Sequence, residues 1–131
     1  SITGQEFSEM SDEEAKKKKF AGSTTLYYFK EMGRKTAADY LLESSKPVLI
    51  MQGGKDFQCL ADEDFKGFQD QLAGRENTEY KLYPYLNHCF VTALYDDITK
   101  ASKEYSLERH IGEDVIKDIA EFIKGGPENA A

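Results

Sequence analysis

The chain mixes apolar and polar positions throughout, but one short run is apolar at every position. Residues 48–51 are Val, Leu, Ile and Met, and two glycines follow closely. A continuous run of this length is typical of a strand buried on both faces of a parallel sheet. Residues 79–83 have a second, shorter strand pattern, which Pro84 closes. We therefore expect strands at about 47–52 and 79–83.

The stretch between the two expected strands has the periodicity of a helix. Asp62 is placed to cap this helix, and Gly74 is placed to stop it. Its apolar face contains three residues, Phe65, Phe68 and Leu72. A strand, a helix and a strand at this spacing form a βαβ unit with a right-handed crossover. The pattern therefore predicts the α/β fold class with parallel strands.

A further amphipathic helix is expected at residues 113–124, where two acidic residues occupy the first turn. Its inward face is predicted to contain four apolar residues, Val115, Ile119, Phe122 and Ile123. Residues 125–131 are expected to be a tail.

The N-terminal third is predicted to be mainly helical. Residues 1–10 look irregular, whereas Ser11 and Glu14 have the spacing of a capping box that starts a helix. Helices are expected at residues 11–20, 24–32 and 36–43. We expect one partial domain, in which a helical cap-like segment (1–45) precedes an α/β segment (46–124).

Composition and charge exclude several kinds of partner. The 131 residues fit one domain, and 40% hydrophobic with 31% charged residues is typical of globular proteins. The net charge is −7, and the basic residues 16–19 follow acidic ones, which predicts the pairs Asp12–Lys16 and Glu13–Lys17 on a solvated helix face. Nucleic acid would meet net repulsion, and no apolar run is long enough to cross a bilayer. We expect neither nucleic acid nor a membrane among the partners.

Two polar side chains follow the expected strands and have the chemistry of a proton-transfer pair. Asp56 lies in the loop after the first strand, and His88 lies in the loop after the second. Because functional residues of open α/β sheets lie beyond the carboxyl ends of the strands, these loops should be neighbours. An imidazole can accept and return a proton near neutrality, and a carboxylate can orient it. The alternatives are a simple turn role for Asp56 and a backbone-bonded loop role for His88.

The segments around this pair resemble a known family. Residues 46–58, KPVLIMQGGKDFQ, are similar to the strand-to-acid segment of bacterial α/β-hydrolases in the dienelactone-hydrolase and prolyl-oligopeptidase-like group. Residues 83–90, YPYLNHCF, resemble the histidine loop of the same group. The similarity covers about residues 26–124. It implies the C-terminal part of an α/β-hydrolase fold, with Asp56 as the acid and His88 as the base of a Ser-Asp-His triad.

The nucleophile that this family requires is absent from the sequence. No Gly-x-Ser-x-Gly motif occurs in the 131 residues, and the family's order of nucleophile, acid and base places the serine upstream. The resemblance implies an esterase-like serine hydrolase that acts on small carboxylic esters or amides in the intact parent, while this fragment alone is expected to be inactive. The alternative is a non-catalytic α/β binding or interaction domain. A strand edge without its neighbour also leads us to expect a homo-oligomer.

No cofactor and no metal ion is expected. Cys59 and Cys89 match no CxxC metal motif, and two free thiols or one disulfide both remain open. His110 has no acidic partner in the pattern and is interpreted as a surface or packing residue. Asn87 is expected to brace the histidine loop through side-chain hydrogen bonds.

Overall fold

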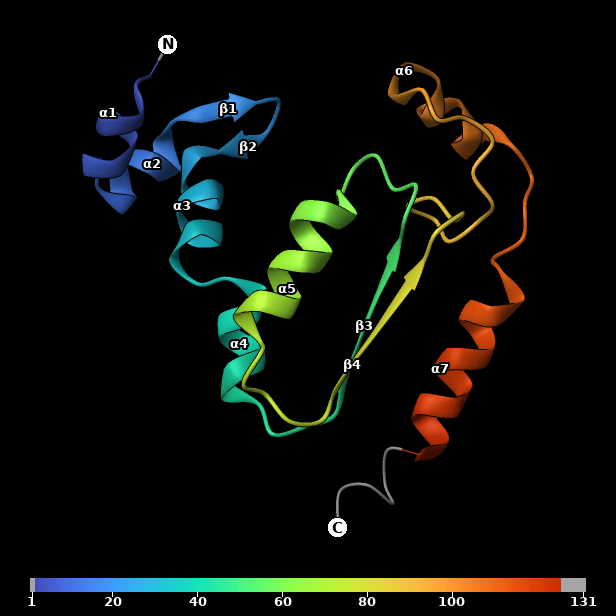
Figure 1. Ribbon diagram of the computed structural model, residues 1–131. Coiled ribbons are helices and arrows are strands. Elements are labelled where there is room, and N and C mark those ends of the chain that lie inside the picture. The colour runs from blue at the N-terminus through green and yellow to red at the C-terminus, as the bar shows by residue number, and fades with distance from the viewer. Residues whose placement is uncertain (1, 126–131) are drawn as a thin grey trace. The chain divides into compact units, whose positions relative to one another are not determined.

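The computed structural model describes residues 2–125, and the chain divides between Glu43 and Ser44 into two compact units (Figure 1). Helices and one short hairpin make up the first unit, and the second contains a two-stranded parallel sheet with helices. The tail predicted at 125–131 lies outside the described residues from position 126 onward. Within the described part of the chain, no helix has the length and apolar character needed to cross a bilayer.

The first unit begins with two short helices that each start with a capping box. Helix α1 spans Gly4–Glu9 and helix α2 spans Asp12–Lys17. In each box the hydroxyl accepts from a backbone N–H three residues later, and the carboxylate at that position accepts in return. The two boxes are Thr3 with Glu6 and Ser11 with Glu14. The box at Ser11 was predicted, but the irregular stretch expected at residues 1–10 was wrong because the first box was not recognised.

A short antiparallel hairpin, which the sequence pattern did not predict, follows α2. Strand β1 (Lys19–Ala21) pairs with β2 (Thr24–Thr25), and Gly22 in the turn has a positive φ of 58°. Because α2 ends at Lys17 and β1 begins at Lys19, the lysine cluster at residues 16–19 is not contained in one helix. The ion pairs expected within the helix were also wrong, since the pairs formed here are Lys16 with Glu13 and Arg34 with Asp12.

Two further helices, α3 (Leu26–Arg34) and α4 (Ala37–Glu43), complete the first unit and confirm the helices predicted there. Met10, Ala15 and Leu26 form its small buried cluster.

Two parallel strands organise the second unit. Strand β3 spans Val48–Gly53 and strand β4 spans Thr78–Tyr83, with Val48 opposite Thr78 and Gly53 opposite Tyr83. Both predicted strands and their parallel pairing are confirmed. Since the two strands end level with each other, the loops that follow them leave the sheet at the same edge.

The connection between the strands begins differently from the prediction. A π-helical segment, η1 (Ala61–Phe65), leads into helix α5 (Lys66–Gln71). Two successive backbone N–H groups in η1 donate to the carbonyl oxygen of Leu60, and no side chain caps this start. The predicted cap by Asp62 was therefore wrong.

The apolar face of this connection packs as predicted. Phe65 and Leu72 are buried, and the ring of Phe65 lies edge-on to Tyr80 of β4, with centroids 6.0 Å apart. This packing holds the crossover helix against the sheet.

After β4 the chain forms helix α6 (Ile98–Ala101), the 3-10 helix η2 (Ser102–Ser106) and helix α7 (Glu113–Gly125). Val115 of α7 is buried, but Ile119 is 40% exposed and Ile123 is 65% exposed. The predicted inward positions of these two isoleucines were therefore wrong.

A polar contact explains how α7 faces the sheet. The carboxylate of Asp118 accepts a hydrogen bond from the hydroxyl of Tyr83 at 2.7 Å and pairs with Lys81. Burial and the bond to Asp118 together raise the pKa of Tyr83 above its usual value of 10.0.

The exposure of apolar residues on α7 has a simple geometric reason. A sheet of two strands has too narrow a surface to cover every apolar residue of this helix.

These exposed surfaces lead us to expect self-association of the chain. Within residues 2–125, β3 is paired only with β4, and α7 exposes isoleucines. An unpaired edge and exposed apolar surface both favour contact with another chain. Size-exclusion chromatography with light scattering should show a mass above that of the monomer at micromolar concentration. Ile119→Lys should shift the equilibrium toward monomer, whereas Lys117→Gln on the same helix should not. A monodisperse wild-type monomer would contradict this expectation.

Candidate active site

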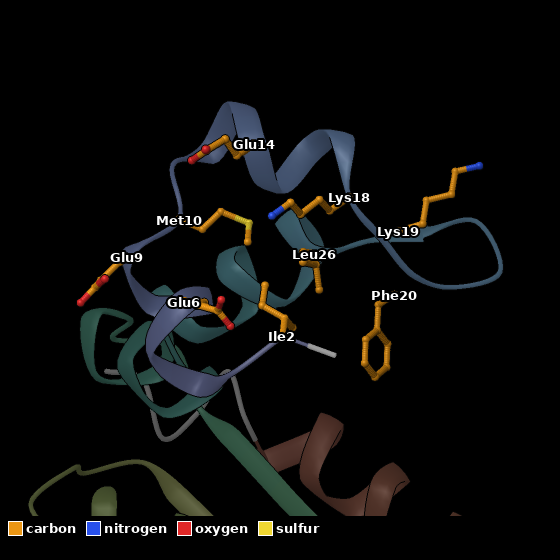
Figure 2. A pocket seen from close by; sticks show the side chains of 9 residues that line it. All are labelled: Ile2, Glu6, Glu9, Met10, Glu14, Lys18, Lys19, Phe20 and Leu26. Atoms are coloured by element: carbon orange, nitrogen blue, oxygen red, sulfur yellow. The ribbon is translucent and has the colours of Figure 1, made fainter.

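The candidate site does not lie in the large pocket of the first unit. That pocket has a volume of about 860 Å³ and is lined by a mixture of acidic, basic and apolar side chains (Figure 2). Among residues 2–125, those that line it include no histidine, serine or cysteine. This described lining therefore offers neither a hydroxyl or thiol nucleophile nor an imidazole base.

Asp56 follows β3 and is held as a carboxylate by a ring of donors. Its side chain is 6% exposed. One oxygen, Oδ1, accepts the backbone N–H groups of Gln58 at 2.8 Å and Cys59 at 3.0 Å, and Oδ2 accepts Nε2 of Gln52 at 3.0 Å. Burial raises the pKa of Asp56, but the hydrogen bonds from Cys59, His88 and Gln58 outweigh burial and lower it below 3.8. Asp56 is therefore an anion at neutral pH.

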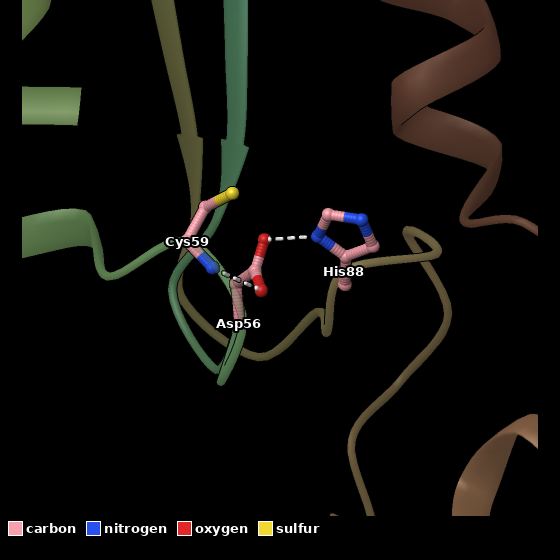
Figure 3. A group of neighbouring side chains, drawn as sticks. All are labelled: Asp56, Cys59 and His88. Carbon is pink, nitrogen blue, oxygen red and sulfur yellow. Dashed lines mark hydrogen bonds and ion pairs between the residues drawn. The ribbon is translucent and has the colours of Figure 1, made fainter. Parts of the chain in front are cut away.

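His88 lies directly against this carboxylate. Its Nδ1 is 2.8 Å from Oδ2 of Asp56, and Figure 3 shows the opposite edge of the ring directed away from that carboxylate. Because an ionised carboxylate can only accept, Nδ1 carries the proton in this pair, and in the neutral form of the ring Nε2 then has a free lone pair. The ring is 40% exposed, so Nε2 is open to a reactant. The expected proximity of the two side chains is confirmed.

The two loops approach so closely because glycines end β3. A Cβ on Gly53 would lie 2.5 Å from the carbonyl oxygens of Leu86 and Asn87, and a Cβ on Gly54 would lie 2.8 Å from Cα of Pro84. Any larger residue would push the histidine loop away from Asp56.

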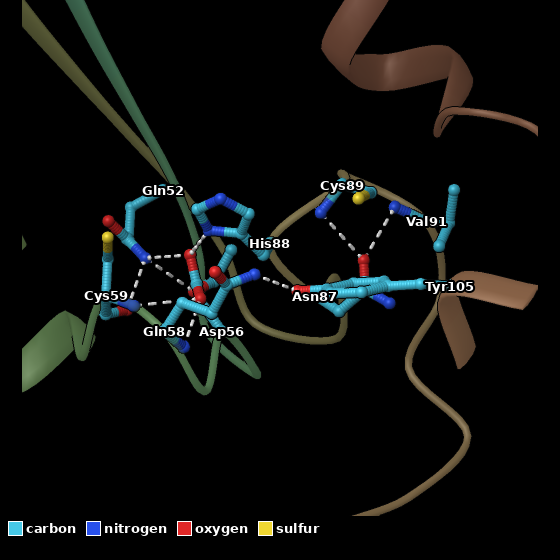
Figure 4. Close-up of polar contacts among 10 residues, drawn as sticks. Gln52, Asp56, Gln58, Cys59, Asn87, His88, Cys89, Val91 and Tyr105 are labelled. Carbon is cyan, nitrogen blue, oxygen red and sulfur yellow. Dashed lines mark hydrogen bonds and ion pairs between the residues drawn. The ribbon is translucent and has the colours of Figure 1, made fainter. Parts of the chain in front are cut away.

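The histidine loop is braced by Asn87, which is 1% exposed. Its Oδ1 accepts the backbone N–H groups of Cys89 at 3.0 Å and Val91 at 3.4 Å, as Figure 4 shows. The predicted bracing role is confirmed. Its Nδ2 donates to Glu104, a buried residue that the sequence pattern did not single out.

Together with Asp56 and His88, Cys59 forms a group of three side chains that could each bind a metal ion. One donor atom from each of Asp56, Cys59 and His88 lies within 4.8 Å of the others. Burial and the negative charge of Asp56 raise the pKa of the Cys59 thiol, so the sulfur is protonated at neutral pH. Both oxygens of Asp56 already accept two hydrogen bonds each. This arrangement therefore suits proton transfer better than metal binding.

The two cysteines and the second histidine of the sequence differ in their positions relative to this group. Cys59 and Cys89 are both free thiols, and Cys89 is exposed beside His88. His110 is exposed and precedes α7.

Part of the chain is similar to a known esterase. A curated esterase is 26% identical to the chain over 96 residues, which are 73% of this chain and 22% of the other protein. That protein is Esterase EstD from Thermotoga maritima. The chain thus spans about a fifth of the length of this relative. No family model and no solved structure matches the chain.

The close approach at Gly53 can be tested by adding a methyl group. We expect Gly53→Ala to destabilise the fold by about 1–3 kcal/mol, because the new Cβ overlaps two carbonyl oxygens. Gly74→Ala is the matched control, since a Cβ there meets nothing within 4 Å, and it should change stability by less than about 1 kcal/mol. Urea unfolding followed by circular dichroism measures both variants. Equal stability of the Gly53→Ala and Gly74→Ala variants would show that the close approach of the two loops does not require a residue without a side chain at position 53.

Proposed function

We propose that this chain supplies the acid and the base of a serine hydrolase that cleaves carboxylic esters. In this proposal Asp56 orients the imidazole and His88 transfers the proton. The observation that carries it is the 2.8 Å contact between Nδ1 of His88 and Oδ2 of Asp56, which leaves Nε2 free. The similarity to an esterase supports the reaction class.

The nucleophile comes from outside these 131 residues in this proposal. The sequence has no Gly-x-Ser-x-Gly motif, and in the described chain the side chains of Asp56 and His88 form their hydrogen bonds with residues other than serine. The serine and the donors that stabilise the oxyanion belong to another part of the parent protein.

The reaction would proceed in two steps. Nε2 of His88 accepts the serine proton as the serine oxygen attacks the ester carbonyl, and Asp56 stabilises the imidazolium that forms. The imidazolium then protonates the departing alkoxide, which leaves an acyl-serine. In the second step Nε2 takes a proton from water, the hydroxide attacks the acyl group, and the serine leaves with the proton returned from His88. Each step uses the same nitrogen as base and then as acid.

Esters are preferred to amides because the similar protein is named an esterase. A non-catalytic α/β interaction domain is the second candidate, and the missing nucleophile motif favours it. The two candidates differ in whether the whole protein turns over an ester.

Hydrolysis of p-nitrophenyl butyrate by the whole protein that contains this sequence separates them. We expect His88→Ala and Asp56→Asn to lower kcat/KM by about 10³-fold or more, because the base or its correct tautomer is lost. The 131-residue chain alone should hydrolyse no ester above background and should not react with a fluorophosphonate probe.

The matched control is His110→Gln, which removes the other histidine of the chain and should leave kcat/KM unchanged. Whole protein without esterase activity, or with activity that survives His88→Ala, would exclude the proposed reaction and favour the interaction domain. Labelling of a serine in the isolated chain would show that the nucleophile was wrongly placed.

A further inference from the structure

A buried carboxylate that the proposed reaction does not use lies against the histidine loop. Glu104 of η2 is 4% exposed, and its partner Asn87 is 1% exposed. We propose that Glu104 is a positioning residue, which fixes the orientation of the Asn87 side-chain amide and thereby the turn that presents His88 to Asp56.

Glu104 is surrounded by donors. Its Oε2 accepts Nδ2 of Asn87 at 2.6 Å, and its Oε1 accepts the backbone N–H groups of Leu94 at 2.7 Å and Tyr95 at 2.8 Å. The carboxylate therefore joins η2 to three residues on either side of the histidine in sequence, Asn87 before it and Leu94 and Tyr95 after it. Burying a charge is unfavourable unless such hydrogen bonds satisfy it. A buried carboxylate with a full set of donors at this place therefore calls for a structural explanation.

The chemistry of the two groups allows only one orientation of the amide. An ionised carboxylate accepts hydrogen bonds and donates none, whereas the Asn87 side chain has an oxygen that accepts and an NH₂ group that donates. Glu104 therefore requires the NH₂ group of Asn87 to face its carboxylate. This choice leaves Oδ1 of Asn87 to accept from Cys89 and Val91. A flipped amide would place oxygen against oxygen and NH₂ against two N–H groups.

The same asparagine closes the turn around the histidine. Its backbone N–H donates to the carbonyl oxygen of Val91, and its carbonyl oxygen accepts from the N–H of Phe90, both at 2.9 Å. Phe90 has a φ of +57°, a conformation that is unfavourable for a residue with a large side chain. The bonds to Asn87 hold this conformation, and His88 is the second residue of the turn.

The proposal rests on the proposed function only in naming His88 as the base. The position of His88 can be measured in the isolated chain, without any activity. The readout is the downfield ¹H NMR resonance of the Nδ1–H group of His88, which is observed only while that proton is held in the bond to Asp56 and protected from water.

Glu104→Gln should cause loss of this resonance. Glutamine has one acceptor oxygen in place of two, so its NH₂ group faces either Asn87 or the N–H groups of Leu94 and Tyr95. The double variant Asn87→Asp with Glu104→Gln exchanges the two groups and makes every donor meet an acceptor again. The resonance should return in the double variant. Glu108→Gln, at an exposed position just after η2, is the matched control and should keep the resonance.

Circular dichroism melts of all variants separate positioning from unfolding. A folded Glu104→Gln variant that keeps the resonance would overturn the proposal. If Glu104→Gln does not fold, the double variant decides, because a swap that is unfolded or lacks the resonance overturns the proposal as well. If the swap restores the resonance while the whole protein hydrolyses no ester, the positioning role stands and the proposed function fails.

Discussion

The loops that carry Asp56 and His88 approach each other at Gly53, where backbone carbonyl oxygens occupy the space that a side chain would need. This contact depends on the level ends of two parallel strands and on the absence of a side chain at the end of β3. The backbone bond from Lys55 N–H to the carbonyl oxygen of Leu86, at 2.9 Å, closes the contact on the other side. The contact between Asp56 and His88 follows from this approach of the backbones, because neither side chain needs to reach far.

Two buried carboxylates, one before and one after the histidine loop in sequence, are satisfied by hydrogen bonds. Neutral donors surround Asp56 on one loop and Glu104 behind the other, so each carboxylate is charged although it is buried. Net hydrogen bonding lowers the pKa of both groups despite the opposing effect of burial. The imidazole of His88 is more exposed than either carboxylate, and the edge of its ring that carries Nε2 is directed away from Asp56. A carboxylate fixed by hydrogen bonds beside an accessible imidazole is an arrangement that suits proton transfer.

The parts of the fold that the sequence predicted are those with a local signal. Residues 48–51 are apolar at every position, which predicts a strand buried on both faces, and polar residues after parallel strands predict a shared edge. Glu104 was missed because its partners are set by three-dimensional folding and no periodicity marks it. Ile119 and Ile123 were misplaced for a related reason, since helical periodicity identifies an apolar face but not the width of the sheet that covers it. The proximity of Asp56 and His88 could be predicted, whereas their proposed catalytic role depends on a nucleophile for which these residues contain no motif.

The tautomer of His88 tests the central claim most directly, and long-range ¹H–¹⁵N NMR of the histidine ring measures it at neutral pH. If the Asp56 carboxylate orients the ring, the proton is on Nδ1, and Nε2 has the ¹⁵N shift of an unprotonated nitrogen. This result would show a free lone pair on the exposed nitrogen of the ring, as the proposed role of His88 requires. A proton on Nε2 with a bare Nδ1 would contradict the account, because His88 would then neither bond to Asp56 as a donor nor accept a proton at its exposed nitrogen.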